Sequence, residues 1–255
     1  MSNGMAGMQV ADGSVDVRLT PWDERTLGMR TAEITRFSPT SAQNGTLLLE
    51  QAEAWCRAHA VRYLFGRFDS GLPHAKQAVL ESGHAIVECS LTLSRRGFAG
   101  LPSVPARMSP TLREFSDRDL AELQRIATDD FFHGRFLEDP SIDPTQAARR
   151  TANWICELAR QGQVYTAELN DRIIGFHAER VSADGRHANL ILTGATARYA
   201  VLGLPLWVVA LESLADRGVT SCSTLISAAN TGIVNLYAKL GFHYDKTLFG
   251  FRKYL

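Results

Sequence analysis

The sequence predicts an α/β protein with a mixed, mostly antiparallel central sheet flanked by helices, preceded by a smaller N-terminal α/β domain. Three apolar runs separated by short turns, at 164–169, 172–181 and 187–195, predict an antiparallel meander. Helical and strand patterns then alternate from residue 204 to the end of the chain. A Gly- and Pro-rich stretch before residue 111 separates this part from an earlier α/β pattern.

The composition supports a division into two domains. With 255 residues, of which 45% are hydrophobic, the chain can bury two modest cores. We expect a disordered lead-in over 1–14, an N-terminal α/β domain over 15–104 and a second domain over 105–255, with the boundary near Val104. The residues that mark the linker are Gly97, Gly100, Pro102, Pro105 and Pro110.

Within the first domain, periodicity predicts alternating strands and helices, although the segment from Pro21 to Ile34 has no clear pattern. The helix at 73–82 ends before Gly83, which is typical of a helix C-terminus. The predicted strands are 15–19, 61–68 and 85–93, and the predicted helices are 47–59 and 73–82.

The second domain begins with a strand at 111–115, and Ser116 with Asp119 then forms a helix-start signature. An aromatic and charged loop at 131–136, followed by Asp139-Pro140, lies between two predicted helices and is interpreted as a lid. The later elements are helices at 145–160 and 204–217, a strand at 220–226, a helix after Asn230 and a closing strand at 244–254.

Charge and cysteine content exclude several classes of protein. The 27 basic and 27 acidic residues balance, and no dense Lys/Arg run occurs, so a nucleic-acid partner is not expected. The four cysteines form no Cys-x-x-Cys, which argues against a metal site and favours reduced thiols in a cytoplasmic protein. No apolar stretch approaches the roughly 20 residues of a membrane span, and no secretory signal is evident at the N-terminus.

The stretch from Leu190 to Phe242 carries the main functional signal. A short apolar run ending at Leu192-Thr193 predicts a buried strand, and Arg198 to Gly203 follows as a turn into a helix that begins at Leu204. Backbone N–H groups in such a strand–loop–helix passage lack internal partners, so the passage is suited to bind an anion.

Downstream, Asn230, Tyr237 and Gly241-Phe242 complete a pattern that resembles the acetyl-CoA-binding half of the GNAT N-acetyltransferase superfamily. In that family the cofactor loop is Gln/Arg-x-x-Gly-x-Gly/Ala, and Val201 departs from it because a glycine is usual there. The resemblance implies the GNAT fold and acetyl-CoA as co-substrate. The cofactor-binding residues that it implies are Leu192, Thr193, Arg198, Val201, Leu202, Gly203, Leu204, Asn230 and Tyr237.

The resemblance also implies catalytic roles. Backbone N–H groups near Thr193 or Gly194 would receive the thioester oxygen, and Tyr237 would be the general acid that protonates the departing thiolate. The candidates for a general base are Glu179, His177 and His133. His177 and Glu179 share one face of the strand by alternation, and that face is either the cleft or solvent.

A finer resemblance concerns the acceptor. The segment Pro21-Trp22-Asp23, the extra N-terminal domain and Arg135-Phe136 with Asp139-Pro140 are similar to the TDP-fucosamine acetyltransferase group. This implies a nucleotide-linked amino sugar, with Arg135 near its diphosphate, Phe132 or Phe136 against a ring, and His177 on the substrate side. The alternative is that these aromatic residues only attach the loop to the core.

The two domains also share a spacing. Val61 precedes Gly83 by the interval that separates Val219 from Gly241, and each interval reads as strand, loop, helix and glycine. The first domain is therefore interpreted as a degenerate half-GNAT repeat. In this copy Leu72 replaces Asn230 and Val79 replaces Tyr237, so it has lost the polar groups that would carry chemistry.

The sequence thus predicts an acetyl-CoA-dependent N-acetyltransferase for a small-molecule amine, with a nucleotide sugar as one acceptor and a homodimer as one assembly. Two alternatives stay open. One is a binding module that senses acyl-CoA without catalysis, and the other is an N-acyltransferase for another amine or a peptide.

Overall fold

The computed structural model describes residues 4–198 and 203–255 and divides into two compact units. The sequence predicts a single boundary near Val104. In the structure, two segments that follow Val104 in the chain belong to the first unit. Unit 1 consists of Met1–Ser90, Gly134–Gln146 and Lys246–Leu255, and unit 2 consists of Leu91–His133 and Ala147–Asp245.

The sheet of unit 1 has the strand order β1-β2-β3-β4-β11-β5, where β3 and β4 are parallel and β11 runs antiparallel to β4. Two long strands, β5 (Ala85–Arg96) and β11 (His243–Tyr254), contribute one part of their length to each unit. The other elements of unit 1 are β1 (Met5–Val10), β2 (Gly13–Leu19), α1 (Pro21–Leu27), β3 (Thr31–Ser38), α2 (Ala42–Ala58), β4 (Tyr63–Asp69) and α3 (Pro73–Glu81).

Two strands of unit 1 differ from the prediction. The expected disordered lead-in contains β1, which pairs antiparallel with β2 from Met5↔Arg18 to Val10↔Gly13. The unassigned segment from Pro21 to Ile34 contains α1 and the first half of β3. The backbone hydrogen bonds that order an edge strand are independent of side-chain hydrophobicity, so the polar, Gly-rich composition of the first residues did not reveal β1.

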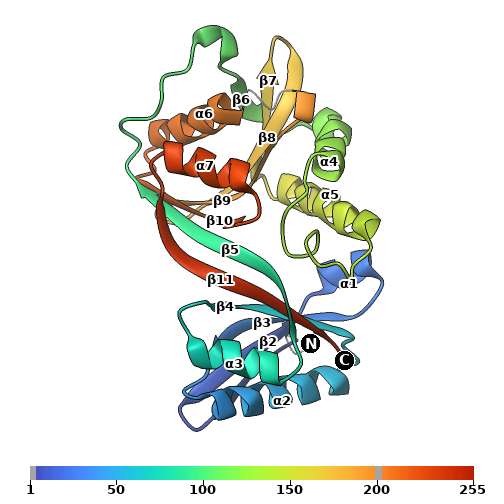
Figure 1. Cartoon of the computed structure of the whole chain (residues 1–255). Helices are drawn as coiled ribbons and strands as arrows, with labels where there is room; N and C mark the ends of the chain where they lie inside the picture. Colours follow the sequence, from blue (N-terminus) through green and yellow to red (C-terminus); the bar gives the residue numbers. More distant parts are fainter. Residues whose placement is uncertain (1–3, 199–202) are drawn as a thin grey trace. The chain divides into compact units, whose positions relative to one another are not determined.

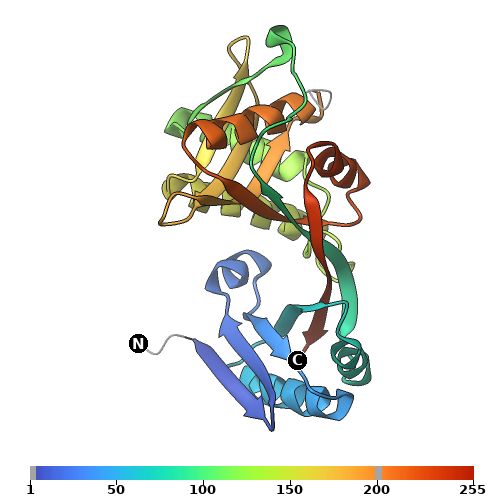
Figure 2. The ribbon, with the colours of Figure 1, turned by 90° about the vertical axis from the view of Figure 1, so that its left-hand side faces the viewer.

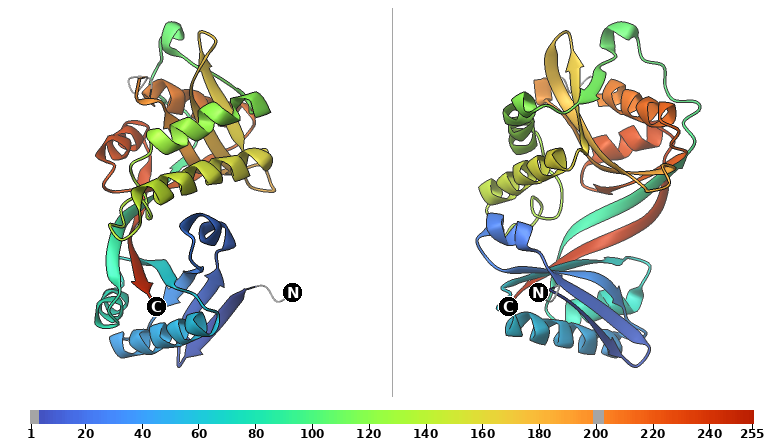
Figure 3. Two further views of the ribbon diagram at one scale, coloured as in Figure 1. Left: turned by 90° about the vertical axis from the view of Figure 1, so that its right-hand side faces the viewer. Right: turned by 180° about the vertical axis from the view of Figure 1, so that it is seen from behind.

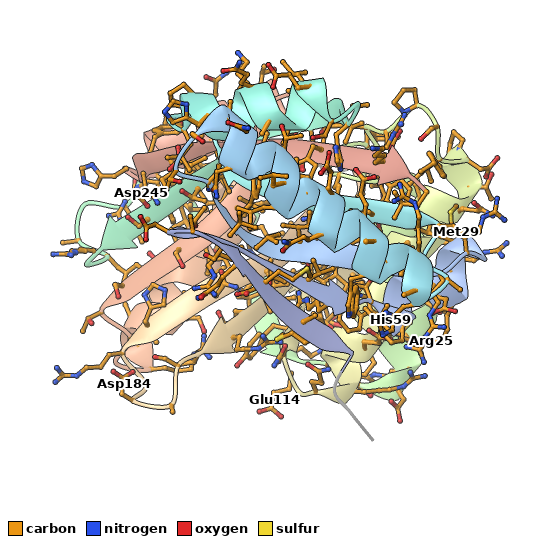
Figure 4. The ribbon with its side chains drawn as sticks, turned by 90° about the horizontal axis from the view of Figure 1, so that it is seen from below. Arg25, Met29, His59, Glu114, Asp184 and Asp245 are labelled. Atoms are coloured by element: carbon orange, nitrogen blue, oxygen red, sulfur yellow. The ribbon has the colours of Figure 1, made fainter. Side chains whose placement is uncertain are left out.

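Helices α2 and α3 cover one face of the unit 1 sheet (Figures 2 and 4). The Ser41 side chain accepts a hydrogen bond from the Asn44 N–H and caps α2, and Figure 4 labels His59 where this helix ends. Figure 4 also labels Arg25 in α1 and Met29 just after it. The largest side chains of the core between helices and sheet are Ile34, Phe37, Leu48, Leu49, Leu64, Phe68 and Phe251.

The segment Gly134–Gln146 is attached to unit 1 by buried polar and aromatic contacts. Arg135 Nη1 donates to Glu33 Oε1 at 3.2 Å, and its guanidinium carbon lies 4.4 Å from the centre of the Phe65 ring. Phe136 meets Phe65 edge-on at 5.3 Å between ring centroids. Asp139 accepts a 2.7 Å hydrogen bond from the Tyr63 hydroxyl. These contacts contradict the prediction of a lid, because its Asp139-Pro140 part is fixed to unit 1.

Unit 2 has the strand order β11-β5-β10-β9-β8-β7-β6. Helices α6 and α7 lie on one face of this sheet and α4 and α5 on the other (Figures 1 and 3). The elements are β6 (Thr111–Glu114), α4 (Leu120–Asp129), α5 (Pro144–Arg160), β7 (Val164–Leu169), β8 (Arg172–Val181), β9 (His187–Ala195), α6 (Gly203–Asp216), β10 (Ser221–Ser227) and α7 (Thr231–Lys239), with short 3₁₀ turns at Ala106–Met108 and Asp117–Asp119.

Several sequence signals in unit 2 are confirmed. The Asp119 carboxylate accepts a hydrogen bond from the Ser116 N–H, which completes the predicted capping box. Strands β7, β8 and β9 form the predicted antiparallel meander, and Figure 4 labels Asp184 in the turn that joins the last two. The predicted linker is not a free tether, because four of its apolar side chains pack on the core beneath α6 and α7, namely those of Phe98, Leu101, Val104 and Met108.

The predicted repeat is present and extends further than the sequence suggested. Strand β4 and helix α3 start 158 residues before β10 and α7, since 221 − 63 and 231 − 73 both equal 158. The same offset relates β5 to β11 at both ends (243 − 85 and 254 − 96) and the last residues of α2 and α6 (216 − 58). Gly83 and Gly241 both adopt positive φ after their helices. The first copy has no counterpart of β6, α4 and α5 among the described residues.

The two copies exchange their last strands. Residues Leu248–Tyr254 of β11 pair with β4 of the first copy, although β11 follows β10 and α7 in the chain. The end of β5, from Leu91, belongs to unit 2, where β5 neighbours β10. Each sheet is therefore completed by a strand from the other half of the sequence.

A buried histidine in unit 1 predicts a pH-dependent stability. His84 meets the Phe251 ring edge-on, and burial lowers the pKa of its imidazole from 6.5 to about 4, with Glu53 opposing and Lys253 reinforcing the shift. The unfolded chain binds this proton below about pH 6.5, whereas the folded chain excludes it until about pH 4. The free energy of unfolding is therefore unaffected by this histidine above pH 6.5. It falls as the pH drops from 6.5 toward 4, by about 3 kcal/mol in total.

Urea unfolding at pH 7 and pH 5 checks this expectation. The loss of unfolding free energy between these two pH values should be about 2 kcal/mol smaller in His84→Gln than in the parent chain. His74→Gln, at an exposed position of α3, should leave the pH dependence unchanged. An equal pH dependence in the parent and His84→Gln would show that His84 does not cause it.

Candidate active site

Strands β9 and β10 part in the middle of the unit 2 sheet. They pair in parallel from Ser221↔His187 to Thr224↔Leu190, and no pairing between them continues in the described residues beyond that point. The Thr224 hydroxyl donates to the Leu190 carbonyl at 3.0 Å and marks where the strands separate. Both strands continue past this point, β9 to Ala195 and β10 to Ser227, so a gap opens between their C-terminal ends.

A β-bulge explains why β9 bends away at this position. The pairing of β9 with β8 shifts between Ala178↔Leu192 and Glu179↔Leu190, which leaves Ile191 as an extra residue. A bulge bends its strand and increases the local twist. Because Ile191 directly follows the last residue of β9 that pairs with β10, the bulge directs the rest of the strand away from β10.

The hydrogen-bond register shows which backbone groups face the gap. The Thr196 N–H donates to the Ile174 carbonyl of β8, and hydrogen-bonded pairs alternate along an antiparallel ladder. Gly194 is therefore a hydrogen-bonded partner of Phe176, whereas the N–H and C=O of Thr193 point toward the gap. Of the two positions predicted to receive a thioester oxygen, the register favours Thr193.

The loop after β9 leads to a hollow and to the start of α6. Val201 and Leu202 lie outside the described residues, while Gly203 and Leu204 form the first residues of α6. Arg198 lies at the rim of a hollow of about 540 Å³. The other residues that line this hollow are Glu122, Arg125, Asp130, Arg172, Ile173, Thr196 and Ala197.

Two oxygens of this hollow, Asp130 Oδ2 and Thr196 Oγ1, are buried without a hydrogen bond among the described residues, and only Asp130 Oδ2 has a cation near it, Arg125 Nη1 at 3.9 Å. The other Asp130 oxygen accepts a hydrogen bond from the Ala197 N–H at 3.1 Å, which ties the end of α4 to the end of β9. Buried oxygens without partners are costly, so the hollow is suited to a ligand that donates hydrogen bonds.

Tyr237 lies beneath the point where the strands part. Its ring packs edge-on against Phe242 at 4.7 Å and Trp207 at 6.4 Å between centroids, and only 3% of the residue is exposed. Burial raises the pKa of its phenol to about 12, although hydrogen bonding by Trp207 and Thr224 opposes the rise. The phenol is therefore protonated at neutral pH. The indole Nε1 of Trp207 makes no hydrogen bond of good geometry within the described residues.

Asn230, predicted from the resemblance as a cofactor-binding residue, is the N-cap of α7 in the structure. Its side chain accepts a hydrogen bond from the Ile233 N–H at 3.2 Å and caps α7, the helix that carries Tyr237. The cap fixes where α7 begins and hence where Tyr237 faces the sheet.

His177 and Glu179 form a buried polar chain on β8. His177 Nδ1 lies 2.7 Å from the Thr193 hydroxyl, and His177 Nε2 lies 3.0 Å from Glu179 Oε2. Glu179 Oε1 lies 2.5 Å from Arg217, which follows α6. Burial alone would raise the pKa of Glu179, but His177 and Arg217 hold it below its ordinary value. The shared face of His177 and Glu179 is thus an interior face, and the chain ends at the strand that borders the gap.

The other predicted residues lie elsewhere. His133 is exposed at the end of the unit 2 segment that follows α4, and Phe132 is 69% exposed. Arg135 and Phe136 belong to unit 1, where Phe136 is buried and Arg135 is paired with Glu33. Burial lowers the pKa of Arg135 to about 10, so the residue remains charged. The alternative reading, in which Arg135 and Phe136 attach the loop to a core, describes these two side chains better than contact with a diphosphate.

The sequence interpretation missed Trp207, Thr224 and Arg217. Alternation could have identified Thr224 as an inward-facing residue, because it lies on the same strand face as the buried Cys222, in the predicted strand that precedes Tyr237. Trp207 and Arg217 carry no local signal, since their contacts with Tyr237 and Glu179 join elements that are distant in sequence.

Sequence comparison identifies no family model that matches this chain, and no curated protein matches it. Comparison with solved structures, in contrast, finds many similar chains.

A GCN5-related N-acetyltransferase from Sphaerobacter thermophilus aligns over 94% of this chain and 76% of its own, at 17% identity and a TM-score of 0.67. A tandem GNAT protein from the clavulanic acid biosynthesis pathway aligns over 98% and 83%, at 15% identity and a TM-score of 0.62. A glucosamine N-acetyltransferase region of a fungal multi-domain β-N-acetylglucosaminidase aligns over 94% of this chain and 31% of its own, at 13% identity and a TM-score of 0.63. Together with the parted strands and the internal repeat, these similarities show that the chain has the GNAT fold.

Proposed function

We propose that this protein is an acetyl-CoA-dependent N-acetyltransferase that acts on a small-molecule amine. The observation that carries the proposal is the gap between β9 and β10, with the Thr193 N–H directed into it and the Tyr237 phenol hydrogen-bonded to Thr224, the last residue of β10 that pairs with β9. A hydrogen-bond donor and a proton donor are the two groups that transfer of an acyl group from a thioester requires.

The residues present fit acetyl-CoA. The gap would accept the extended pantetheine arm, and the N-terminal N–H groups of α6, which begins at Gly203, would face the pyrophosphate. Bound acetyl-CoA supplies an activated acyl group and a thiolate leaving group. The Thr193 N–H would stabilise negative charge on the acyl oxygen, and the Tyr237 hydroxyl would donate the proton that the thiolate takes up.

We also propose that His177 and Glu179 assist removal of the proton from the amine through the Thr193 hydroxyl. The support is the continuous chain from Thr193 to His177 and Glu179. His177→Gln should then lower kcat with little change in the KM for acetyl-CoA, because the chain from Thr193 to Glu179 is broken. A rise in the KM for acetyl-CoA together with a lower melting temperature would instead indicate that His177 only supports β9. His133, which is exposed, is the remaining candidate base.

Amino sugars, free or nucleotide-linked, are the first acceptors to test. A structural neighbour is described as a glucosamine N-acetyltransferase region. The motif Arg135-Phe136 with Asp139-Pro140 does not add support, because Arg135, Phe136 and Asp139 make internal contacts of unit 1.

Two measurements test the proposed function. Acetyl-CoA should raise the melting temperature of the protein, and release of free CoA thiol should accelerate with at least one member of an amine panel that contains amino sugars, nucleotide amino sugars, polyamines and peptides. Stabilisation without thiol release for any amine would indicate an acyl-CoA sensor. The absence of both effects would contradict an acetyl-CoA site in this chain.

A further inference from the structure

A second hollow of unit 2, with a volume of about 590 Å³, lies at the other end of β10 from the gap. The neighbouring loop is attached to the start of β10 by a 2.8 Å hydrogen bond from the Gly97 N–H to the Thr220 carbonyl, whereas the gap opens beyond Thr224. We call this site the basic hollow. Its lining residues are Ser94, Arg95, Arg96, Ala99, Gly100, Lys239, Leu240, Gly241, His243 and Asp245.

Arg95 is built into the wall of the basic hollow. It is 8% exposed, and it donates from Nε to the Gly97 carbonyl at 2.9 Å and from Nη2 to the Ala99 carbonyl at 2.7 Å. Both hydrogen bonds go to neutral acceptors, and no carboxylate among residues 4–198 and 203–255 forms an ion pair with it. A buried guanidinium is costly unless its charge is compensated, and here the two carbonyls fix its orientation without neutralising it.

Gly241 allows this guanidinium to lie against the end of α7. A Cβ atom at position 241 would lie 2.9 Å from Arg95 Nη1, and the backbone there has a φ of 71°. The N–H groups of Gly241 and Phe242 return to the carbonyls of Ala238 and Tyr237, which closes α7 in a Schellman motif. These carbonyls are thereby satisfied by the backbone and are not required to pair with a cation.

The charge of the basic hollow departs from the balance of the whole chain. Arg95, Arg96 and Lys239 contribute three positive charges to the basic hollow, and Asp245 contributes one negative charge. The whole protein, in contrast, has a formal net charge of zero. Ser94 donates a 3.0 Å hydrogen bond to Asp245 Oδ1 and so occupies part of that carboxylate. His243 adds two ring nitrogens to the lining. Such a set of donors is complementary to a small anion that carries two negative charges.

We propose that the basic hollow binds a phosphate group, either as inorganic phosphate or as the phosphate of a phosphorylated small molecule. Arg95 would offer Nη1, the nitrogen that its two carbonyl contacts leave uncommitted. Arg96 and Lys239, which are exposed at the rim, would complete the contact. This inference does not depend on the proposed acetyl transfer, because none of these residues lies at the gap.

Isothermal titration with inorganic phosphate at low ionic strength tests the proposal. Lys239→Gln should weaken phosphate binding about three-fold to ten-fold, because one charge that faces the anion is lost. Asp245→Asn should strengthen binding by a similar factor, since it removes the repelling charge. The matched control is Arg149→Gln, an exposed arginine of α5 outside the basic hollow, which should leave binding unchanged. Arg95 is left intact because its replacement would detach the loop at Gly97.

A second titration with glycerol phosphate identifies the source of the phosphate group. Tighter binding of the ester than of inorganic phosphate, with the same loss in Lys239→Gln, would indicate a phosphorylated metabolite. Tighter binding of inorganic phosphate would indicate the free ion. Phosphate binding that is absent, or that is equal in Lys239→Gln, Asp245→Asn and Arg149→Gln, would overturn the proposal. The thiol-release assay reports on the gap separately, so failure of either site can be recognised.

Discussion

Replacing Tyr237 with phenylalanine is expected to reduce the kcat of acetyl transfer about 100-fold or more, while the KM for acetyl-CoA changes little. The substitution removes the phenol hydroxyl beneath the closed end of the gap and keeps the ring that packs on Phe242 and Trp207. General acid catalysis commonly contributes 10²–10⁴-fold. The leaving thiolate would have to take its proton from water, and steady-state thiol release measures the difference.

Tyr244→Phe is the matched control for this experiment. The Tyr244 side chain, in β11, is exposed, and its hydroxyl donates at 2.8 Å to the Val234 carbonyl of α7, the helix that carries Tyr237. The control should retain nearly full turnover. Equal turnover in Tyr237→Phe and Tyr244→Phe would remove Tyr237 as the acid and leave it a core aromatic residue. A fall in the melting temperature of Tyr237→Phe alone would identify a packing effect.

The second large effect is expected at Asp139, and it concerns stability. The buried Asp139 carboxylate accepts hydrogen bonds from the Tyr63 hydroxyl at 2.7 Å and from Arg252 Nε at 3.2 Å. Its other oxygen accepts from the N–H and the hydroxyl of Ser141. Asp139→Ala would leave the Arg252 charge and the Tyr63 hydroxyl without their acceptor. Breaking a buried pair in this way costs about 3–5 kcal/mol.

Chemical unfolding followed by intrinsic fluorescence measures this loss as a fall in the free energy of unfolding. Asp139→Asn keeps an acceptor oxygen but loses the charge. Its free energy of unfolding should therefore lie between that of the parent chain and that of Asp139→Ala. Tyr63→Phe removes one donor without exposing a charge, and it should cost only about 1–2 kcal/mol. A cost below 1 kcal/mol for Asp139→Ala would show that Gly134–Gln146 detaches readily and would restore the idea of a lid.

The order of elements in unit 2 could be predicted because its signals are local. Ser116 with Asp119 specifies a helix start, alternation specifies the three strands of the meander, and Gly241 specifies a helix end. The places of Thr193 in β9 and of Tyr237 in α7 also follow from local order, since each lies at a fixed distance from a strand end or a helix cap.

What the sequence could not show depends on contacts between distant residues. Nothing in the sequence near Arg135 indicates that it would form an ion pair with Glu33, 102 residues earlier. Two partners of Asp139, Tyr63 and Arg252, lie 76 residues before it and 113 residues after it. Residues that are suited to a ligand-binding loop are equally suited to a buried attachment, and only tertiary structure decides between them.

The exchange of β5 and β11 has a consequence for biosynthesis. The Leu255 N–H donates to the carbonyl of Arg62 at 3.0 Å, and β11 completes the sheet beside β4. While the polypeptide is still being translated, β1 to β4 have emerged but their neighbour has not. The first half must therefore wait, with an unpaired strand edge, until β11 has been translated. We expect a nascent chain that stops before residue 246 to need a chaperone, even though most of its residues have already been made.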